Sequence, residues 1–225
     1  DLADPLRATR ALESADMVVA LTAFKSAAQG HADVMLPIAP FSETAGTFVN
    51  AEGRPQSFYG VVKPLGETRP AWKVLRVLGT MLDLPGFGFE TAEEVRAQAL
   101  GDTTTLAQRL NNDAALGATS ANAAAGFERI ADVPIYTTDV LVRRAPALQQ
   151  TADARAPVVS VSTSAWSQLG LKDGDRVRVQ VGGGVATLPV RCDATLAAQA
   201  VRVPTGHPAT AELGPLFAPV ELSKA

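Results

Sequence analysis

The sequence has little of what redox and metal sites are built from. Its 225 residues include one cysteine, Cys192, and two histidines, His31 and His207. A single cysteine excludes a disulfide within the chain, fits a reducing compartment, and cannot hold an iron–sulfur cluster, which needs about four thiolates. The histidines are far apart and show no ligand spacing. We therefore predict no metal site, and we interpret Cys192, which has no neighbouring histidine, as a structural or incidental thiol.

A concentrated charge of one sign is also missing. Lys and Arg number 20 and Asp and Glu 23, which gives a formal net charge of −3. Without a basic stripe or a cluster of Lys and Arg, binding to nucleic acid or to an anionic membrane has little support. The longest apolar runs, such as 17–21, fall far short of the roughly 20 residues that span a bilayer. We expect no direct membrane insertion and, without a basic head and apolar stretch at the start, no signal peptide.

The chain does have enough apolar residues for a core. Hydrophobic residues make up 47% of it, so disorder is not expected. The charged fraction of 19% is below the roughly 25% usual for soluble domains. Two explanations stay open, an alanine-rich composition or a surface partly covered by partner subunits. Because the sequence starts at Asp1 and quickly enters a helical pattern, we expect a fragment of a longer polypeptide.

The first part of the chain predicts α/β structure. A short helix is expected over 5–14, and apolar strands over 17–21 and 32–36 flank a helical piece at 24–29. This order is one crossover unit of a parallel sheet whose strands are buried on both faces. One unit cannot bury both faces by itself, so we expect a partial Rossmann-like layer whose other strands lie outside this sequence.

Two further helices follow in this part of the chain. One is expected after Thr68, its cap, with Pro70 in the first turn and an apolar stripe through Leu75 and Leu78. The other opens at Thr91 with a capping-box pattern and runs towards Leu100.

From residue 157 onwards the pattern predicts a compact, mostly antiparallel β-barrel. A short capped helix over 162–170 lies between the first two strands, and Gly182-Gly183-Gly184 predicts a hairpin turn. The expected strands are 158–161, 176–181, 185–191 and 199–203.

The segment before the barrel shows little periodicity. Residues 111–126 predict a flexible connection, and short strands are expected at 135–136 and 140–142. The predicted organisation is therefore an α/β portion (1–110), a linker and irregular segment (111–156) and a barrel domain (157–225).

Catalytic motifs do not emerge from the sequence. Pro85-Gly86-Phe87-Gly88-Phe89 imitates part of a dinucleotide fingerprint, but it follows a helix instead of joining a strand to a helix. The hydroxyl cluster of Ser160, Ser162, Thr163 and Ser164 is explained mostly by a helix cap, and we interpret His207 as a surface or packing histidine. No Ser-His-Asp set or pair of acid–base carboxylates is found, so the chain is predicted to be non-catalytic by itself.

The most informative stretch is residues 43–57, ETAGTFVNAEGRPQS, directly after a predicted strand. Its composition predicts a shaped loop. Glycines at 46 and 53 allow close backbone approaches, Asn50 can bond its own backbone, and Glu52 and Arg54 can each hold a turn with charge-assisted hydrogen bonds.

This loop resembles the Gly-Thr-Phe-x-Asn-x-Glu-Gly-Arg-x-Gln loop of the molybdopterin oxidoreductase superfamily, and Asp33-Val34-Met35-Leu36-Pro37 resembles the strand before it. The continuation GETRPAWKVLRVLG (66–79) is similar to the G-subunit family of bacterial NADH-quinone oxidoreductase, respiratory complex I. The segments 165–175 and 202–208 resemble the C-terminal region of the same family. The resemblance covers most of residues 16–82 and 157–221.

The resemblance implies a double-psi β-barrel, which binds part of the pterin cofactor in true molybdenum enzymes. For a G-subunit region it implies a structural role in NADH to quinone electron transfer coupled to proton translocation. No catalytic, cofactor-binding or metal residue is then expected here. Iron–sulfur clusters would belong to an N-terminal region outside this sequence. The implied partners are other hydrophilic-arm subunits, and the implied location is the cytoplasmic side of the bacterial inner membrane.

Two alternatives stay open. The first is a fragment of a true molybdopterin-dependent enzyme of the formate dehydrogenase or nitrate reductase type. In that case Asn50, Glu52, Arg54, Ser162 and Thr163 are candidate cofactor contacts. The helical segment 72–78 argues against this alternative. The second is a free-standing binding module built on the barrel, against which the unpartnered strands at 16–36 argue.

Overall fold

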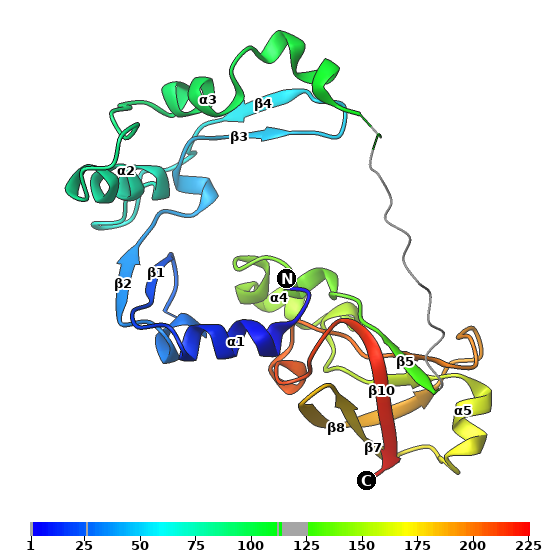
Figure 1. Ribbon diagram of the computed structural model, residues 1–225. Coiled ribbons are helices and arrows are strands. Elements are labelled where there is room, and N and C mark those ends of the chain that lie inside the picture. Colours follow the sequence, from blue (N-terminus) through cyan, green and yellow to red (C-terminus); the bar gives the residue numbers. More distant parts are fainter. Residues whose placement is uncertain (1, 26, 112, 114–125) are drawn as a thin grey trace. The chain divides into compact units, whose positions relative to one another are not determined.

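The chain divides into two units in the computed structural model, which describes residues 2–25, 27–111, 113 and 126–225 (Figure 1). Unit 1 comprises residues 1–14 and 120–225, and unit 2 comprises residues 15–119. This division differs from the predicted one, because the first helix and residues 127–130 of the expected linker belong to the barrel unit. The flexible connection expected over 111–126 lies mostly outside the described residues.

The elements follow the chain in both units. The helices are α1 Pro5–Glu13, α2 Ala71–Met81, α3 Ala92–Leu100, α4 Pro146–Gln149 and α5 Thr163–Gln168. The strands of unit 2 are β1 Val19–Thr22, β2 Val34–Pro37, β3 Gly46–Val49 and β4 Pro55–Phe58. Those of unit 1 are β5 Phe127–Ile130, β6 Val159–Val161, β7 Arg176–Val181, β8 Gly184–Cys192, β9 Ala200–Arg202 and β10 Phe217–Lys224. The 3₁₀ turns are η1 Ala27–Gly30, η2 Phe41–Glu43, η3 Thr103–Arg109, η4 Ile135–Thr137, η5 Val142–Arg144, η6 Ala152–Ala154 and η7 Pro208–Thr210.

Unit 1 is a closed barrel of strand order β10-β5-β9-β6-β8-β7 (Figure 1). Its ladders are mixed: β5 with β9 and β6 with β8 are parallel, whereas the remaining neighbours are antiparallel. The barrel is therefore confirmed, but its expected antiparallel character is not. Local patterns reveal hairpins such as β7–β8, whereas a parallel ladder depends on a crossover that returns the chain to the same sheet. The double-psi type stays a prediction.

The barrel interior is filled by β-branched and leucine side chains. β7 alternates as the sequence predicts, with its three valines buried and its arginines exposed. The core cluster consists of Val159, Val161, Ala165, Leu171, Val177, Val179, Val181, Leu188, Val190, Val201, Val203, Leu213 and Val220. Because six strands enclose this cluster, unit 1 has a core of its own.

Among the described residues of this unit, one charged side chain is buried. The guanidinium of Arg129 on β5 donates through Nη1 to the carbonyls of Gly214 (2.9 Å) and Pro215 (3.1 Å) and through Nη2 to that of Val203 (3.4 Å). Its Nε has no partner within the described residues, and burial lowers the pKa of Arg129 below its ordinary value. These bonds join β5 to the chain after β9 and to the segment before β10.

Two sequence expectations for unit 1 are wrong and two strands were not predicted. The stretches 135–136 and 140–142 are not strands; η4 and η5 occupy this region instead. β5 and β10 pair with each other and close the barrel. The capped helix α5 and the strands β6, β7, β8 and β9 are confirmed to within two residues at each end.

Unit 2 has little buried core among its described residues. The predicted parallel pairing of β1 with β2 is confirmed, from Val19 opposite Val34 onwards. Burial on both faces is wrong, because no residue of either strand is fully buried and Val19 is 41% exposed. The described residues give this sheet two strands, so the Rossmann-like layer is not confirmed.

Apart from its 3₁₀ turns, the other described elements of unit 2 are a hairpin and two α-helices. The stretch expected as a loop contains the antiparallel pair β3–β4. Thr91 caps α3 as predicted by accepting from the Glu94 amide at 3.1 Å, whereas α2 starts after Pro70 without a side-chain cap. None of the described helices has the length and hydropathy needed to cross a membrane.

Candidate functional site

The first three candidate residues lie in the tight turn between β3 and β4. Asn50 Oδ1 accepts from the backbone amides of Glu52 (3.0 Å) and Arg54 (2.9 Å), which is an Asx-type arrangement. The Glu52 and Arg54 side chains approach to 3.7 Å but are 73% and 71% exposed, so this ion pair contributes little stability. All three residues take part in the geometry of their own turn.

This turn is packed against η3 through Gly53. Gly53 is buried and has a φ of +76°, and a Cβ built there would lie 2.9 Å from the Ala107 Cα and 3.0 Å from its nitrogen. No side chain fits between the turn and η3, so glycine is required. One side of the turn is therefore committed to contacts within unit 2.

The other two candidates lie at the start of α5 in unit 1. Ser162 is 2% exposed, and its Oγ caps the helix by accepting from the Ala165 amide (3.2 Å) and also bonds the Ala198 carbonyl (3.0 Å). The Thr163 hydroxyl accepts a long contact of 3.8 Å from the Cys192 thiol, which is exposed. Ser162 is thus a structural cap, and the five sequence candidates form two sets in two different units rather than one site.

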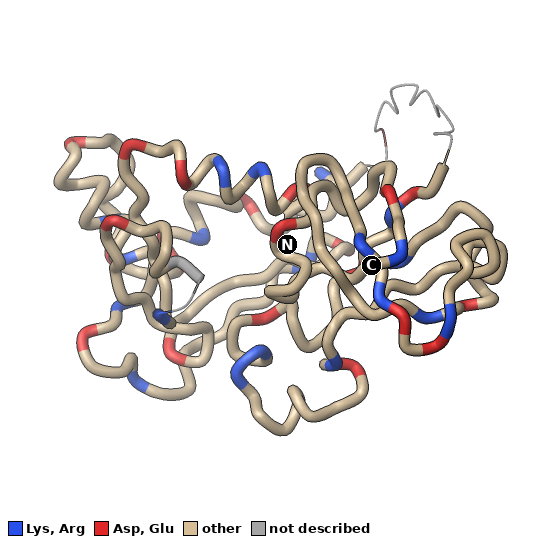
Figure 2. Tube along the Cα trace, turned by 90° about the horizontal axis from the view of Figure 1, so that it is seen from below, with Lys and Arg blue, Asp and Glu red and all other residues tan. Residues whose placement is uncertain are grey.

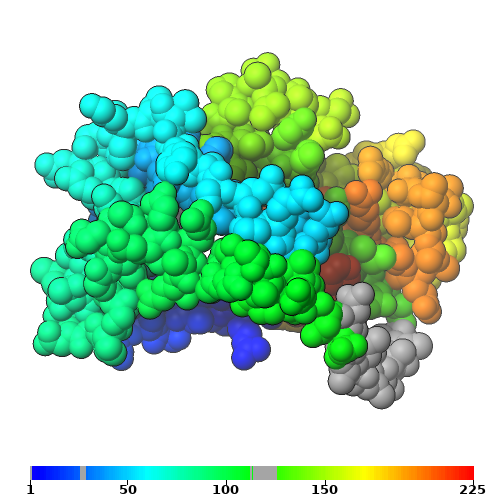
Figure 3. All heavy atoms as spheres, turned by 90° about the horizontal axis from the view of Figure 1, so that it is seen from above, coloured from blue at the N-terminus to red at the C-terminus, as the bar shows by residue number. Residues whose placement is uncertain are grey.

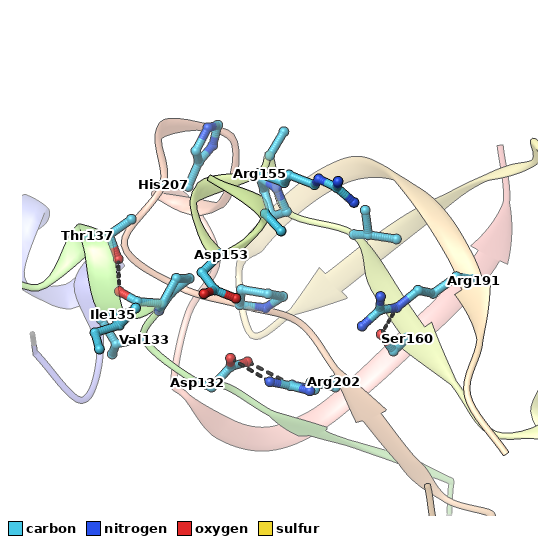
Figure 4. Close-up of a pocket in the computed structure, with 16 residues that line it drawn as sticks. Asp132, Val133, Ile135, Thr137, Asp153, Arg155, Ser160, Arg191, Arg202 and His207 are labelled. Atoms are coloured by element: carbon cyan, nitrogen blue, oxygen red, sulfur yellow. Dashed lines mark hydrogen bonds and ion pairs between the residues drawn. The ribbon is translucent and has the colours of Figure 1, made fainter. Parts of the chain in front are cut away.

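A different set of residues lines a cavity of unit 1. The cavity measures about 540 Å³ and is lined by three arginines and two aspartates, together with Ser160 and His207 (Figure 4). The arginines come from three distant places in the sequence: Arg155 precedes β6, Arg191 lies on β8 and Arg202 lies on β9. Barrel closure brings them together.

Two of these arginines have protein partners. Arg202 donates to both carboxylate oxygens of Asp132, through Nε at 3.0 Å and through Nη2 at 2.8 Å. Arg191 donates through Nε to the buried Ser160 hydroxyl at 2.9 Å, and its terminal nitrogens have no partner within the described residues. Arg155 has no hydrogen bond or ion pair in that part of the chain, and Figure 4 shows it on the opposite side of the cavity from Asp132. The cavity therefore presents guanidinium donors suited to an anionic group.

Asp132 and Arg202 shift each other's pKa values. Hydrogen bonding from Arg202 is the main cause that holds the pKa of Asp132 below its ordinary value; partial burial opposes the shift, and the charges of Arg202 and Arg191 add to it. The same pair raises the pKa of Arg202. Asp132 is thus ionised near neutral pH. The lining holds three arginines and two aspartates.

We predict that Asp132→Asn lowers stability near neutral pH by at most about 1 kcal/mol, because the pair is partly exposed. A carboxyl with a lowered folded-state pKa stabilises the fold above its ordinary value of 3.8 and loses this effect as the pH falls through the lowered pKa. The difference between the variant and the parent should therefore vanish in acid. Urea unfolding as a function of pH measures this.

The matched control for this prediction is Asp153→Asn. Asp153 lines the same cavity but makes no hydrogen bond or ion pair within the described residues. A pH dependence of equal size in both variants would contradict the assigned role of the Asp132–Arg202 pair.

Metal ligands do not gather in the part of the chain that the structure describes. No group of three His, Cys, Asp or Glu side chains there is arranged to hold an ion. Cationic and anionic residues are interspersed along the described part of the trace (Figure 2). The arginine cavity is thus the most distinctive polar site. Sequence analysis missed it because each arginine looks like an ordinary strand-end or loop cation.

Two family models match the chain. The one described as Molybdopterin oxidoreductase matches residues 1–81, and the one described as Molydopterin dinucleotide binding domain matches residues 135–220. The second match includes Arg155, Arg191 and Arg202 but not Asp132.

Curated relatives and a solved structure are also similar to this chain. The G subunit of the NADH-quinone oxidoreductase of Streptomyces coelicolor is 34% identical over 85% of this chain, and that of Mycobacterium tuberculosis is 34% identical over 84%. This chain spans 23% of the length of each. A predicted formate dehydrogenase of Staphylococcus aureus is 40% identical over 32% of this chain, which covers 7% of that protein. In fold, the acetylene hydratase of Pelobacter acetylenicus is similar with a TM-score of 0.60 and 16% identity, over 97% of this chain and 42% of the hydratase.

Proposed function

Because the chain belongs to the molybdopterin oxidoreductase family and resembles its NADH-quinone oxidoreductase G-subunit members, we propose that it is the C-terminal structural region of such a protein. The observation that carries the proposal is the extent of the similarity. The alignment with the G-subunit relative covers 85% of this chain, whereas that with the formate dehydrogenase relative covers 32%. In this role the segment has no redox centre and supports electron-carrying parts of the parent protein.

The turn at residues 50–54 supports a structural role. Asn50 accepts hydrogen bonds from backbone amides of the turn, and Gly53 packs closely against η3. The Glu52–Arg54 pair is exposed. The Asn50 amide oxygen and the Gly53 backbone are thereby engaged within unit 2. We propose that the segment associates with other hydrophilic-arm subunits on the cytoplasmic side of the bacterial inner membrane.

Purification of the parent protein from its own cells through a tag on this chain tests the proposal. We expect NADH-quinone oxidoreductase activity to co-purify, while molybdenum, tungsten and pterin stay far below one equivalent. A stoichiometric amount of any of the three would overturn the proposal. Failure of the activity to co-purify would also contradict it.

A second candidate function is binding of a pterin dinucleotide by the barrel, which the arginine cavity favours. The guanidinium groups of Arg155 and Arg191 would hold the diphosphate of such a cofactor, whose pterin supplies the metal-ligating dithiolene when a metal is bound. The excess of arginine over aspartate fits an anionic group. Ser162, by contrast, is already bonded and buried, so it is a poorer candidate contact than the sequence suggested.

For this second function we predict that inorganic pyrophosphate binds the full chain and that Arg155→Met weakens binding about tenfold, through loss of one charge-assisted contact. Arg155 makes no bond within the described residues, so the substitution should leave the fold intact. Isothermal titration calorimetry measures the affinity. Arg178→Met, an exposed arginine on β7 outside the cavity, is the control. Equal affinities in the two variants would exclude this use of the cavity.

A further inference from the structure

A row of exposed apolar side chains follows β4 in unit 2. Val61 is 87% exposed, Leu65 79%, Tyr59 73% and Val62 58%. Figure 3 shows the cyan part of the chain that includes these residues at the outer surface of unit 2. Large apolar side chains exposed this close together in the sequence are typical of an interaction site.

The row is held in place by the chain before it. The Val61 amide donates to the Ser42 carbonyl at 2.8 Å, and the Leu65 amide donates to Glu43 Oε2 at 2.9 Å. These contacts join residues far apart in the sequence. The apolar side chains therefore belong to a positioned surface, which reduces the ordering that a partner must impose.

A groove of about 930 Å³ lies beside this row. The start of α2 and residues 90–93 form the rest of its lining. Trp72 and Tyr59 line it with Val61 and Val62. Tryptophan and tyrosine are the side chains that most often anchor protein–protein interfaces, because each adds a large apolar area with a polar edge. We refer to this feature as the unit 2 groove.

The acidic side chains of the unit 2 groove have partners, whereas its basic side chains have no acidic partner within the described residues. Each of its carboxylates has a partner: Glu43 accepts from Leu65, Glu90 pairs with Arg76 at 2.9 Å, and Glu93 accepts from Tyr59 at 3.4 Å. Its cations have no acidic partner within the described residues. They are Lys63, Arg69, which donates to the Thr68 carbonyl, and Lys73, which lies over the Trp72 ring.

From this complementarity we propose that the unit 2 groove docks a polypeptide segment of a partner protein that carries carboxylates beside apolar side chains. Its apolar groups would cover the valines and Trp72, and its carboxylates would pair with Lys63, Arg69 and Lys73. This inference goes beyond the proposed function and does not depend on the identity of the parent enzyme.

Photo-crosslinking in the intact cell tests the inference. The full chain, in its parent protein, carries p-benzoylphenylalanine at Val61, and crosslinked peptides are sequenced by mass spectrometry. Phe217, 65% exposed in unit 1, is the control position. We expect one partner segment rich in Asp or Glu next to apolar residues, and at least about a tenfold lower yield in Lys63→Glu/Arg69→Glu. The matched control is Lys172→Glu/Arg178→Glu in unit 1.

Changing the carboxylates of the identified segment to lysine should restore the yield in Lys63→Glu/Arg69→Glu. Crosslinks that spread over many polypeptides as at Phe217, that go to phospholipid, or that do not respond to the charge reversal would overturn the inference. A specific acidic segment found in a preparation without NADH-quinone oxidoreductase activity would contradict the proposed function and leave the groove assignment standing.

Discussion

Replacing Gly184 with alanine is expected to prevent the barrel from closing, with a loss of about 4 kcal/mol or more in the free energy of unfolding. Gly184 is the first residue of β8 and pairs with Val181 of β7. A Cβ built there overlaps the carbonyl oxygen of Glu212 and lies 2.8 Å from its carbonyl carbon and 3.0 Å from the Leu213 Cα. The atoms that the new Cβ would meet belong to the backbone of Glu212 and Leu213. Because Leu213 is fully buried, this backbone cannot move away without disturbing the core.

Gly183→Ala, in the same hairpin, is the matched control. A Cβ at Gly183 would approach only the end of the Arg10 side chain, at 3.3 Å, and the Leu6 side chain at 4.0 Å, and Arg10 can move. We expect a change within about 1 kcal/mol for this variant. Urea unfolding followed by Trp166 fluorescence in a Trp72→Phe background reports on unit 1, because Trp166 lies on α5. Similar losses in the two variants would show that the approach of Glu212 to Gly184 does not decide the stability of the barrel.

The parts of the fold that sequence reasoning recovered are those with strong local signals. β7 alternates valine with polar residues, and α5 has a serine cap at one end and a glycine at the other. β5 carries no such signal. In its sequence, Phe-Glu-Arg-Ile, the residue that the barrel buries is the charged Arg129. Arg129 is acceptable there only because carbonyls from two distant segments surround its guanidinium. Such partners are set by barrel closure and cannot be found from local periodicity.

The candidate site shows the same limit. The loop motif correctly drew attention to residues 50–54, and its expected turn chemistry, an asparagine bonding its own backbone, is present. The arginine cavity escaped prediction because Arg155, Arg191 and Arg202 become neighbours only through the β6–β8 and β6–β9 ladders. The parallel ladder joins strands separated by α5 and β7. A sequence pattern of a few residues does not show which distant strands will pair.

Replacing Gly53 with alanine is expected to destabilise unit 2 by about 3 kcal/mol, from a left-handed backbone that disfavours a Cβ and from a clash with the backbone of Ala107. Gly66→Ala separates these two causes. Gly66 also has a positive φ, of +58°, but a Cβ there would meet no atom within 4 Å, so only the conformational part, about 1–2 kcal/mol, should appear. Trp72 fluorescence in a Trp166→Phe background reports on unit 2 during urea unfolding.

The comparison between Gly53→Ala and Gly66→Ala also tests the role of the turn. If the turn is structural, the stability loss at Gly53 should lower the amount of assembled parent protein, while the activity of each assembled molecule stays unchanged. In that case the Asx turn and the contact with η3 act on folding alone, so the assembled amount should fall while the activity of each assembled molecule does not change. A Gly53→Ala protein that assembles normally but loses activity per molecule would instead place the turn at a ligand, as the alternative with Asn50, Glu52 and Arg54 as cofactor contacts requires.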